Sequence, residues 1–122
     1  MKQGEWVRLG HEGSSMRIIN QDGYKVVIFE GELDFFNDPM VDLNPFCTED
    51  LILDFQGVTF VDCSWIWKLL RYYRNLAENG RRLIIIKSSH GLSAIEHILE
   101  HAGLMDYFVL HTDHDSALAS LA

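Results

Sequence analysis

Residues 51–70, LILDFQGVTFVDCSWIWKLL, constrain the fold of this chain more than any other stretch. The apolar run at residues 51–55 is too short for a helix and is typical of a strand buried on both faces. After a turn at Gly57, apolar residues continue to Val61, and the short polar side chains at residues 62–64 mark a helix start. The stretch therefore predicts a strand, a polar turn and a helix, and we expect the function at the helix start.

The predicted helix has one apolar face, with steps of three and four residues. The residues assigned to this buried face are Ile66, Leu69, Leu70, Tyr73, Leu76 and Ala77. Gly80 ends the helix, because glycine readily adopts the left-handed conformation of a helix C-terminus. Trp65 and Trp67 stand on either side of Ile66, so both cannot lie on the buried face.

A β-hairpin is predicted before this unit. Residues 16–20 and 24–30 are strand-like, and Asp22 and Gly23 between them form a common hairpin turn. Residues 31–34, GELD, then leave the sheet. The next segment is interrupted by prolines, which break long helices, so a first helix there is expected to be short or irregular.

Four further elements are predicted after Gly80. In chain order they are a strand at residues 82–87, a helix ending at Gly103, a strand at residues 107–111 and a terminal helix at residues 113–121. The first of these helices is capped by Ser88, Ser89 or Ser93, and the second by Thr112 or Asp113. Strands that alternate with helices predict an α/β fold with a mostly parallel central sheet, an N-terminal hairpin and packed helices.

The composition fits one globular domain. The chain has 122 residues, 48% of them hydrophobic and 23% charged. We expect residues 1–15 to be a lead-in or edge strand and residues 16–122 to be the domain. The net charge of −8 disfavours nucleic acid or an anionic membrane as partner and weakly favours a basic protein. Without a signal-like or membrane-spanning run, and with Cys47 and Cys63 too few for a disulfide scaffold, we expect a cytoplasmic protein.

Several segments resemble the STAS domain family, which includes bacterial anti-sigma factor antagonists and the tails of sulphate transporters. The family has a strand, then Asp-Ser-Ser-Gly or Asp-Ser-Thr-Gly, then a helix; the matching residues here are Asp62, Cys63, Ser64 and Trp65. The other matching segments, in the family's order, are residues 31–34, 80–87 and 103–104. The resemblance implies the STAS fold for most of the chain, from Met16 to Leu121.

The resemblance also implies a function at the helix start. In anti-sigma factor antagonists, a kinase that is also the anti-sigma factor phosphorylates the first serine of the motif and so prevents binding. Cys63 occupies that position here, and a thiol is a poor acceptor for a serine kinase. Ser64 is the neighbouring hydroxyl, but one residue rotates a helical side chain by about 100°. We therefore expect no phosphorylation at Cys63, and we regard Ser64 mainly as a helix-start residue.

Four residues are predicted to contact the partner or shape its site. Asp34 and Asp62 match acidic positions of the family that flank the phosphorylation site, and Asp62 is equally a candidate cap of the helix. Trp65 replaces the glycine of the family motif. Either Trp65 or Trp67 packs beneath residues 35–46, or one of them is an exposed anchor for a partner protein.

The remaining candidates for chemistry are weak. Cys63 at a helix start could be a redox sensor, but no second cysteine follows it closely, and most free cysteines are small buried apolar residues. His97 and His101 have the four-residue spacing of metal ligands, and His90 precedes them, but no third ligand type accompanies them. We therefore expect no enzyme, no metal and no cofactor.

These observations predict a protein-binding regulatory domain similar to an anti-sigma factor antagonist in bacterial signal transduction and transcription regulation. Its expected partner is a kinase-type anti-sigma factor. The alternatives are the accessory STAS subunit of a lipid-transport ATPase, and a sensor of a small ligand or of redox state. Fold alone does not decide among them.

Overall fold

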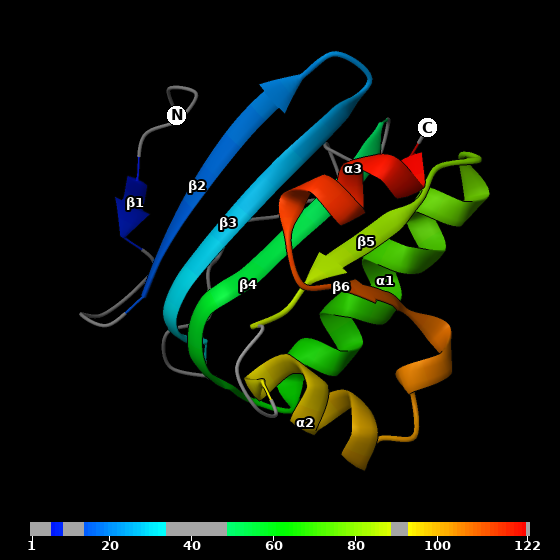
Figure 1. Cartoon of the computed structure of the whole chain (residues 1–122). Coiled ribbons are helices and arrows are strands. Elements are labelled where there is room, and N and C mark those ends of the chain that lie inside the picture. The colour runs from blue at the N-terminus through cyan, green and yellow to red at the C-terminus, as the bar shows by residue number, and fades with distance from the viewer. Residues whose placement is uncertain (1–5, 9–13, 34–48, 89–92, 122) are drawn as a thin grey trace.

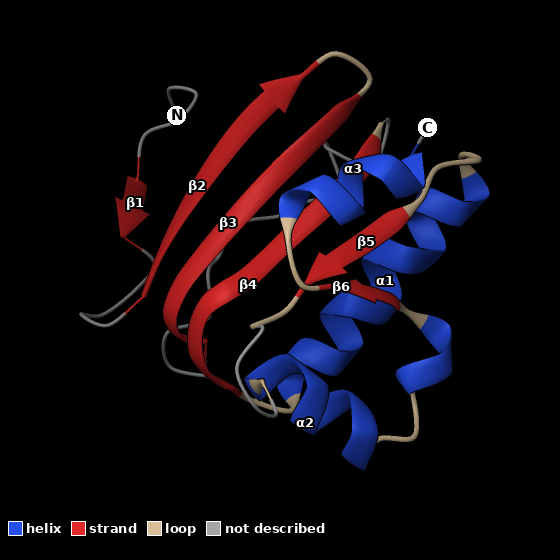
Figure 2. Cartoon of the chain, in the orientation of Figure 1, coloured by secondary structure: helices blue, strands red, loops and turns tan. Residues whose placement is uncertain are grey.

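The computed structural model of the chain describes residues 6–8, 14–33, 49–88 and 93–121. These residues form an α/β domain around a six-stranded sheet, in which the spatial order of the strands is their order along the chain (Figure 1). The strands are β1 (Trp6–Arg8), β2 (Ser14–Gln21), β3 (Tyr24–Leu33), β4 (Asp50–Val61), β5 (Leu83–Ile86) and β6 (Val109–His111). The helices are α1 (Ser64–Glu78), α2 (Ala94–His101), α3 (His114–Leu121) and the short 3-10 helix η2 (Met105–Tyr107). Figure 2 shows helices following each of the last three strands.

The predicted hairpin and the parallel sheet are confirmed. β2 pairs with β3 in antiparallel register, and Gly23 takes a φ of 83° in the tight turn between them. The pairs β3–β4, β4–β5 and β5–β6 are all parallel. β1 pairs antiparallel with β2, so Trp6–Arg8 is the strand at one edge of the sheet.

Two boundaries of the central strands differ from the prediction. β3 continues through Gly31 to Leu33, which pairs with Val61, because irregularities in register absorb the glycine without ending the strand. Gly57 is also inside a strand and not at a turn. A Cβ atom at Gly57 would lie 2.9 Å from the Cγ of Glu30, so the glycine permits β3 and β4 to approach closely at the register shift.

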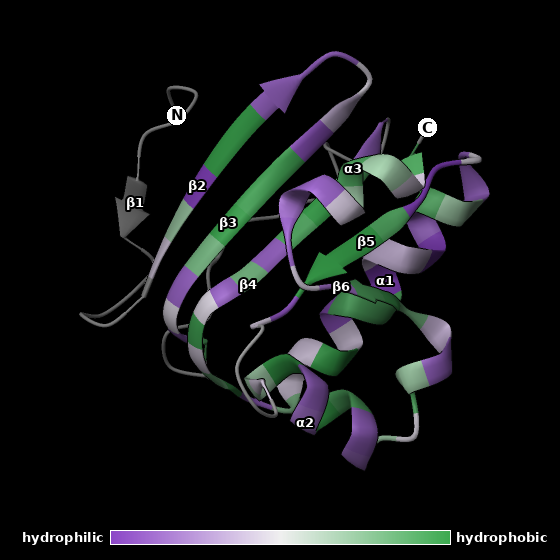
Figure 3. Ribbon diagram, viewed as in Figure 1, coloured by the Kyte–Doolittle hydropathy of each residue, from purple (hydrophilic) through white to green (hydrophobic). Residues whose placement is uncertain are grey.

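The two faces of the sheet are covered by different helices. Alternating residues of the strands point to opposite faces, and α1 and α2 pack on one face while α3 packs on the other (Figure 1). β5 is buried at all four positions, so it contributes to both cores. Figure 3 shows this strand as hydrophobic along its whole length, as expected for a strand between two helical layers.

The buried face of α1 is rotated from the prediction by about one residue. Its buried residues are Trp65, Leu69, Tyr72 and Leu76. Ile66 and Leu70 are only partly buried, and Tyr73 is 39% exposed. The rotation follows from Trp65, whose large ring occupies the core and fixes which side of the helix faces the sheet. The prediction failed because it assigned Ile66, and not its aromatic neighbour, to the centre of the buried face.

The C-terminal half is close to the prediction. Ser93 caps α2 in a reciprocal arrangement with Glu96. Asp113 caps α3, since its Oδ1 accepts a hydrogen bond of 2.7 Å from the Ser116 amide. Tyr107 was expected in the last strand, but it belongs to η2, and β6 begins at Val109.

The segment that was expected to hold a short or irregular helix lies largely outside the described residues. The same is true of Asp34, Cys47 and His90. None of the helices in the described part of the chain is long and apolar enough to span a membrane.

Candidate functional site

The helix start predicted to carry the function lies where β4 passes into α1. The Asp62 amide donates a hydrogen bond of 2.8 Å to the carbonyl of Leu33, which connects this turn to the end of β3. The Asp62 Oδ1 accepts a hydrogen bond of 2.7 Å from the Ser64 amide. Asp62 therefore orients the first helical residue, which is the role expected of it as a candidate cap of the helix.

Cys63 stands between these two residues and is exposed. Its backbone is already helical (φ −59°, ψ −20°), and its side chain caps no amide. The Cys63 carbonyl accepts a hydrogen bond of 3.0 Å from the Ile66 amide, so the backbone is held while the thiol is left accessible. The position that matches the family's phosphoacceptor is thus at the surface, with a thiol in place of a hydroxyl.

Ser64 is oriented differently. Its Oγ is buried and has no hydrogen-bond partner among the described residues. A kinase needs access to the hydroxyl that it modifies, and the Ser64 hydroxyl is not accessible in this conformation. The expected rotation of one residue along the helix accounts for this difference from Cys63.

The two tryptophans are separated as predicted, and the structure decides which is buried. Trp65 is 0% exposed, whereas Trp67 is 76% exposed. The Trp65 ring meets the rings of Phe29 and Phe55 edge to face, with centroid distances of 5.2 Å and 6.0 Å. The hypothesis that Trp65 is an exposed partner anchor is therefore wrong, because the sheet beneath it offers an aromatic pocket that its ring fills.

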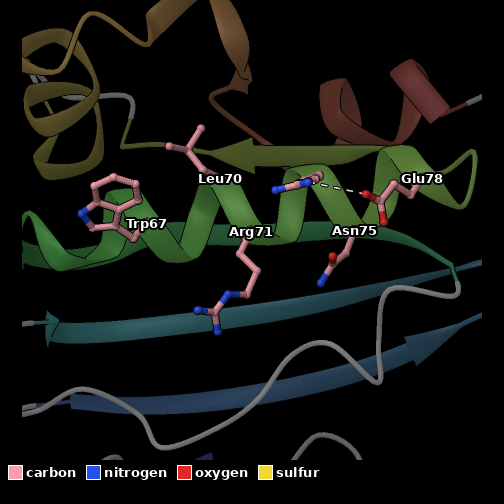
Figure 4. Close-up of a pocket in the computed structure, with 6 residues that line it drawn as sticks. Trp67, Leu70, Arg71, Asn75 and Glu78 are labelled. Atoms are coloured by element: carbon pink, nitrogen blue, oxygen red, sulfur yellow. Dashed lines mark ion pairs between the residues drawn. The ribbon is translucent and has the colours of Figure 1, made fainter.

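Trp67 lies at one end of a surface hollow along α1. The hollow has a volume of about 530 Å³ and is lined by Trp67, Leu70, Arg71, Arg74, Asn75 and Glu78 (Figure 4). Arg74 and Glu78 form an ion pair of 3.5 Å one helical turn apart. An exposed tryptophan beside cationic side chains is a common composition of protein-binding surfaces.

Lys68 is a partly buried residue of α1 that lies between its buried and its exposed face. Its Nζ lies 4.8 Å from the centre of the Trp65 ring, a cation–π contact. Partial burial, and secondly the neighbouring Arg71, lower the pKa of Lys68 from 10.5 to about 8. The ammonium therefore lies in a less polar setting than an ordinary surface lysine.

The positive charge of this region was not predicted from the sequence. Residues 63–95 contain six of the ten lysines and arginines of the chain but one of its eighteen acidic residues. The net charge of −8 hides this separation, because it is a property of the whole chain. A count in windows along the sequence would have found a basic α1–β5 unit in an otherwise acidic protein.

The histidine pair is a surface feature. His97 and His101 are exposed on α2, with ring centroids 5.1 Å apart. Within residues 6–8, 14–33, 49–88 and 93–121, no group of three His, Cys, Asp or Glu side chains is placed to hold a metal ion.

Comparisons with known proteins agree with this fold. The model of the STAS domain family matches residues 15–117. No curated protein sequence matches the chain. Among solved structures, an anti-sigma factor antagonist from Mycobacterium paratuberculosis superposes with a TM-score of 0.70 at 21% identity, covering 92% of this chain and 97% of that one. The Bacillus cell fate determinant SpoIIAA, in its phosphorylated form, superposes with a TM-score of 0.62 at 16% identity, covering 88% and 99%.

Proposed function

Because the chain belongs to the STAS domain family, we propose that it is a regulatory protein-binding domain of the anti-sigma factor antagonist kind. Its partner would be a kinase-type anti-sigma factor in the bacterial cytoplasm. The family model covers most of the chain, and one similar structure is that of an anti-sigma factor antagonist. The domain acts by binding and needs no catalytic residue or cofactor of its own.

The proposed docking surface is the start of α1. Cys63 and Trp67 supply its exposed side chains, and Asp62 sets the backbone on which they stand. Asp34 belongs to the proposal by its match to the family, although it lies outside the described residues. Trp65 supports the surface from within the core and does not touch the partner.

The observation that carries the proposal is the contrast between Cys63 and Ser64. The accessible group at the acceptor position is a thiol, and the neighbouring hydroxyl is buried. We propose that this domain binds its partner without being switched off by phosphorylation at this place. In this respect it would differ from SpoIIAA, whose similar structure is of the phosphorylated form.

Affinity capture from the native cytoplasm tests the partner. The tagged wild-type domain should retain an ATPase of the kinase-type anti-sigma class, and Trp67→Ala should lose it. Leu118→Ala is a matched control, because it also removes an exposed large apolar side chain but lies on α3, on the other face of the sheet. Specific capture of a lipid-transport ATPase would instead support the accessory-subunit alternative.

A phosphorylation assay with the captured kinase tests the switch. The wild type should take up no phosphate, and Cys63→Ser should become a substrate because it restores a hydroxyl at an exposed position. Cys63→Ala, which has no acceptor atom, is the control and should remain unmodified. Phosphate on Ser64 of the wild type would contradict the proposal.

A further inference from the structure

A second hollow lies at the β6 edge of the sheet, toward the C-terminal end of α1. It has a volume of about 340 Å³, within the range of ligand-binding pockets. It is lined by Tyr73, Ala77, Arg81, Arg82, Leu83, Ile84, Tyr107, Val109 and Ser120. These residues come from α1, β5, η2, β6 and α3 and from the loop between α1 and β5, so five elements of the fold contribute to one pocket.

The walls of this edge pocket are unusually apolar for a protein surface. Tyr73, Tyr107 and Val109 are 39%, 58% and 53% exposed, and they are half of the six large hydrophobic side chains that are exposed in the described part of the chain. Leu83 and Ile84 are buried. The Tyr73 ring is held against Phe108, with centroids 5.7 Å apart. Clustered exposed aromatic residues of fixed orientation mark interaction sites more often than scattered ones do.

The charge of the pocket is one-sided. Among the described residues, its lining contains two arginines and no acidic residue. The guanidinium of Arg82 already has partners within the protein. It donates hydrogen bonds of 2.6 Å and 2.8 Å to the carbonyls of Ser120 and Leu121, and it forms an ion pair of 3.8 Å with Asp50. The side chain of Arg81 is exposed and makes no ion pair or hydrogen bond with the described residues. Arg81 is therefore the cation that remains for a ligand.

We infer that the edge pocket binds an acidic segment of a partner protein. An apolar side chain of that segment enters between Tyr73 and Tyr107, and an adjacent carboxylate pairs with Arg81. This surface is separate from the start of α1, so the inference does not depend on the function proposed above.

The charge distribution selects this occupant over two others. Outside residues 63–95 the chain carries seventeen acidic and four basic residues, which repel an extended polyanion such as nucleic acid. In a symmetric contact, the pocket of one copy would face the same pocket of the second copy. Arg81 would then meet no carboxylate, because the described lining residues include no acidic side chain. A short acidic segment meets the local positive charge without approaching the acidic remainder.

A titration followed by amide NMR of the whole chain tests the inference. The probe is a blocked pentapeptide, DEFDE, compared with DEGDE, which lacks the apolar anchor, and QNFQN, which lacks the charge. Saturable shifts should appear at Arg81, Tyr107 and Val109 with DEFDE. Both comparison peptides should bind at least about fivefold more weakly, because each loses one of the two contributions.

Variants of the protein locate the contact. Arg81→Glu should weaken DEFDE binding by about tenfold, since it replaces an attraction by a repulsion, and Tyr107→Ala should weaken it as well. Arg74→Glu is the matched control, because it makes the same change of charge on α1 at a residue outside this pocket.

Four results of the titrations would overturn the inference. They are the absence of saturable shifts, shifts at other residues, an equal loss of binding in Arg74→Glu, and equally tight binding of a short oligothymidylate at the same residues. Shifts at Tyr107 and Val109 that grow with protein concentration, without any peptide, would assign the surface to self-association and also overturn it.

Discussion

The two faces of the sheet are held by different forces. On the face of α1 and α2 a large apolar core extends from β2 to β6 and includes the Phe29, Phe55 and Trp65 rings. On the opposite face the buried cluster is small and consists of Val26, Ile52, Ile84, Ile86 and Ala117. The eight-residue helix α3 buries only Ala117 completely. Apolar burial of this extent is too small to hold a short helix by itself.

Polar contacts at both ends of α3 compensate for the small core. At its first residue, the Nε2 of His114 lies 2.8 Å from the Oδ2 of Asp54, a buried carboxylate on β4. The other oxygen of Asp54 accepts a hydrogen bond of 2.9 Å from the Gln56 amide. At the last turn, Arg82 donates to the carbonyls of Ser120 and Leu121. One face thus depends on packing and the other on a few hydrogen bonds, and variants can test each separately.

The largest expected effect is on the apolar face. Trp65→Ala should lower the free energy of unfolding by about 3–5 kcal/mol, because it empties a fully buried aromatic site. Denaturation in urea measures the loss. Trp65→Phe is the control and should cost much less, since it keeps a ring and removes an indole Nε1 that has no hydrogen-bond partner among the described residues. An equal loss in Trp67→Ala would contradict the assignment of the two tryptophans.

Breaking the Asp54–His114 contact should have a smaller effect, centred on α3. Asp54→Ala should cost about 1–3 kcal/mol, because it leaves the Gln56 amide without its acceptor in a partly buried place. His114→Ala and the double variant complete a thermodynamic cycle, which should show a coupling between the two side chains. Strictly additive losses would mean that the 2.8 Å contact contributes nothing to stability.

Releasing the last turn of α3 should be milder still. Arg82→Ala should cost about 0.5–1.5 kcal/mol, and it should speed hydrogen exchange of the α3 amides more than that of the α1 amides. Arg81→Ala is the matched control and should change stability by less than about 0.5 kcal/mol, because the Arg81 side chain makes no such bonds with the described residues. Uniformly faster exchange in both helices would show that the two faces unfold as one unit.

The smallest effect concerns Lys68. Its lowered pKa means that the unfolded chain binds more protons than the folded one between about pH 8 and 10.5, so wild-type stability should rise across this window. Lys68→Met should lack that rise, and the difference should be less than about 1 kcal/mol since Lys68 is only partly buried. Urea unfolding at several pH values measures it. Arg71→Gln should raise the Lys68 pKa of the folded state and so move the lower end of this pH window upward. An unchanged window would exclude Arg71 as a cause of the lowered pKa.

The sequence was sufficient to predict the features of this fold that depend on neighbouring residues. It was not sufficient to predict the features that depend on contacts between distant residues. The hairpin at Gly23, the caps at Ser93 and Asp113, and the strand–turn–helix unit all depend on neighbours in the chain, so they could be predicted. Gly57 was misassigned because its role depends on Glu30 of the adjacent strand. The pocket around Arg81 could not be predicted, because it joins residues from elements far apart in the sequence.

At the candidate site, the sequence identified the right segment but not the orientation of each side chain. The residue types at 62–64 were sufficient to place the helix start. Which tryptophan is buried depended on Phe29 and Phe55, aromatic residues that only the folded sheet brings together. Periodicity allowed both alternatives, because side chains two residues apart on a helix do not share a face and the pattern does not say which of Trp65 and Trp67 is the buried one.

The strand order also has a consequence for synthesis of the protein. Because the strands stand in the sheet in the order in which they are translated, each new strand finds its template already complete at the growing edge. Each strand can therefore pair as soon as it leaves the ribosome, without waiting for a later strand. The edge formed by β1 stays open, and the opposite edge is always the strand made most recently. α3 covers the face of the sheet opposite α1 and α2, and it is synthesised after the six strands. During translation, the apolar residues of that face are therefore the last to be covered, and until then they are accessible to chaperones.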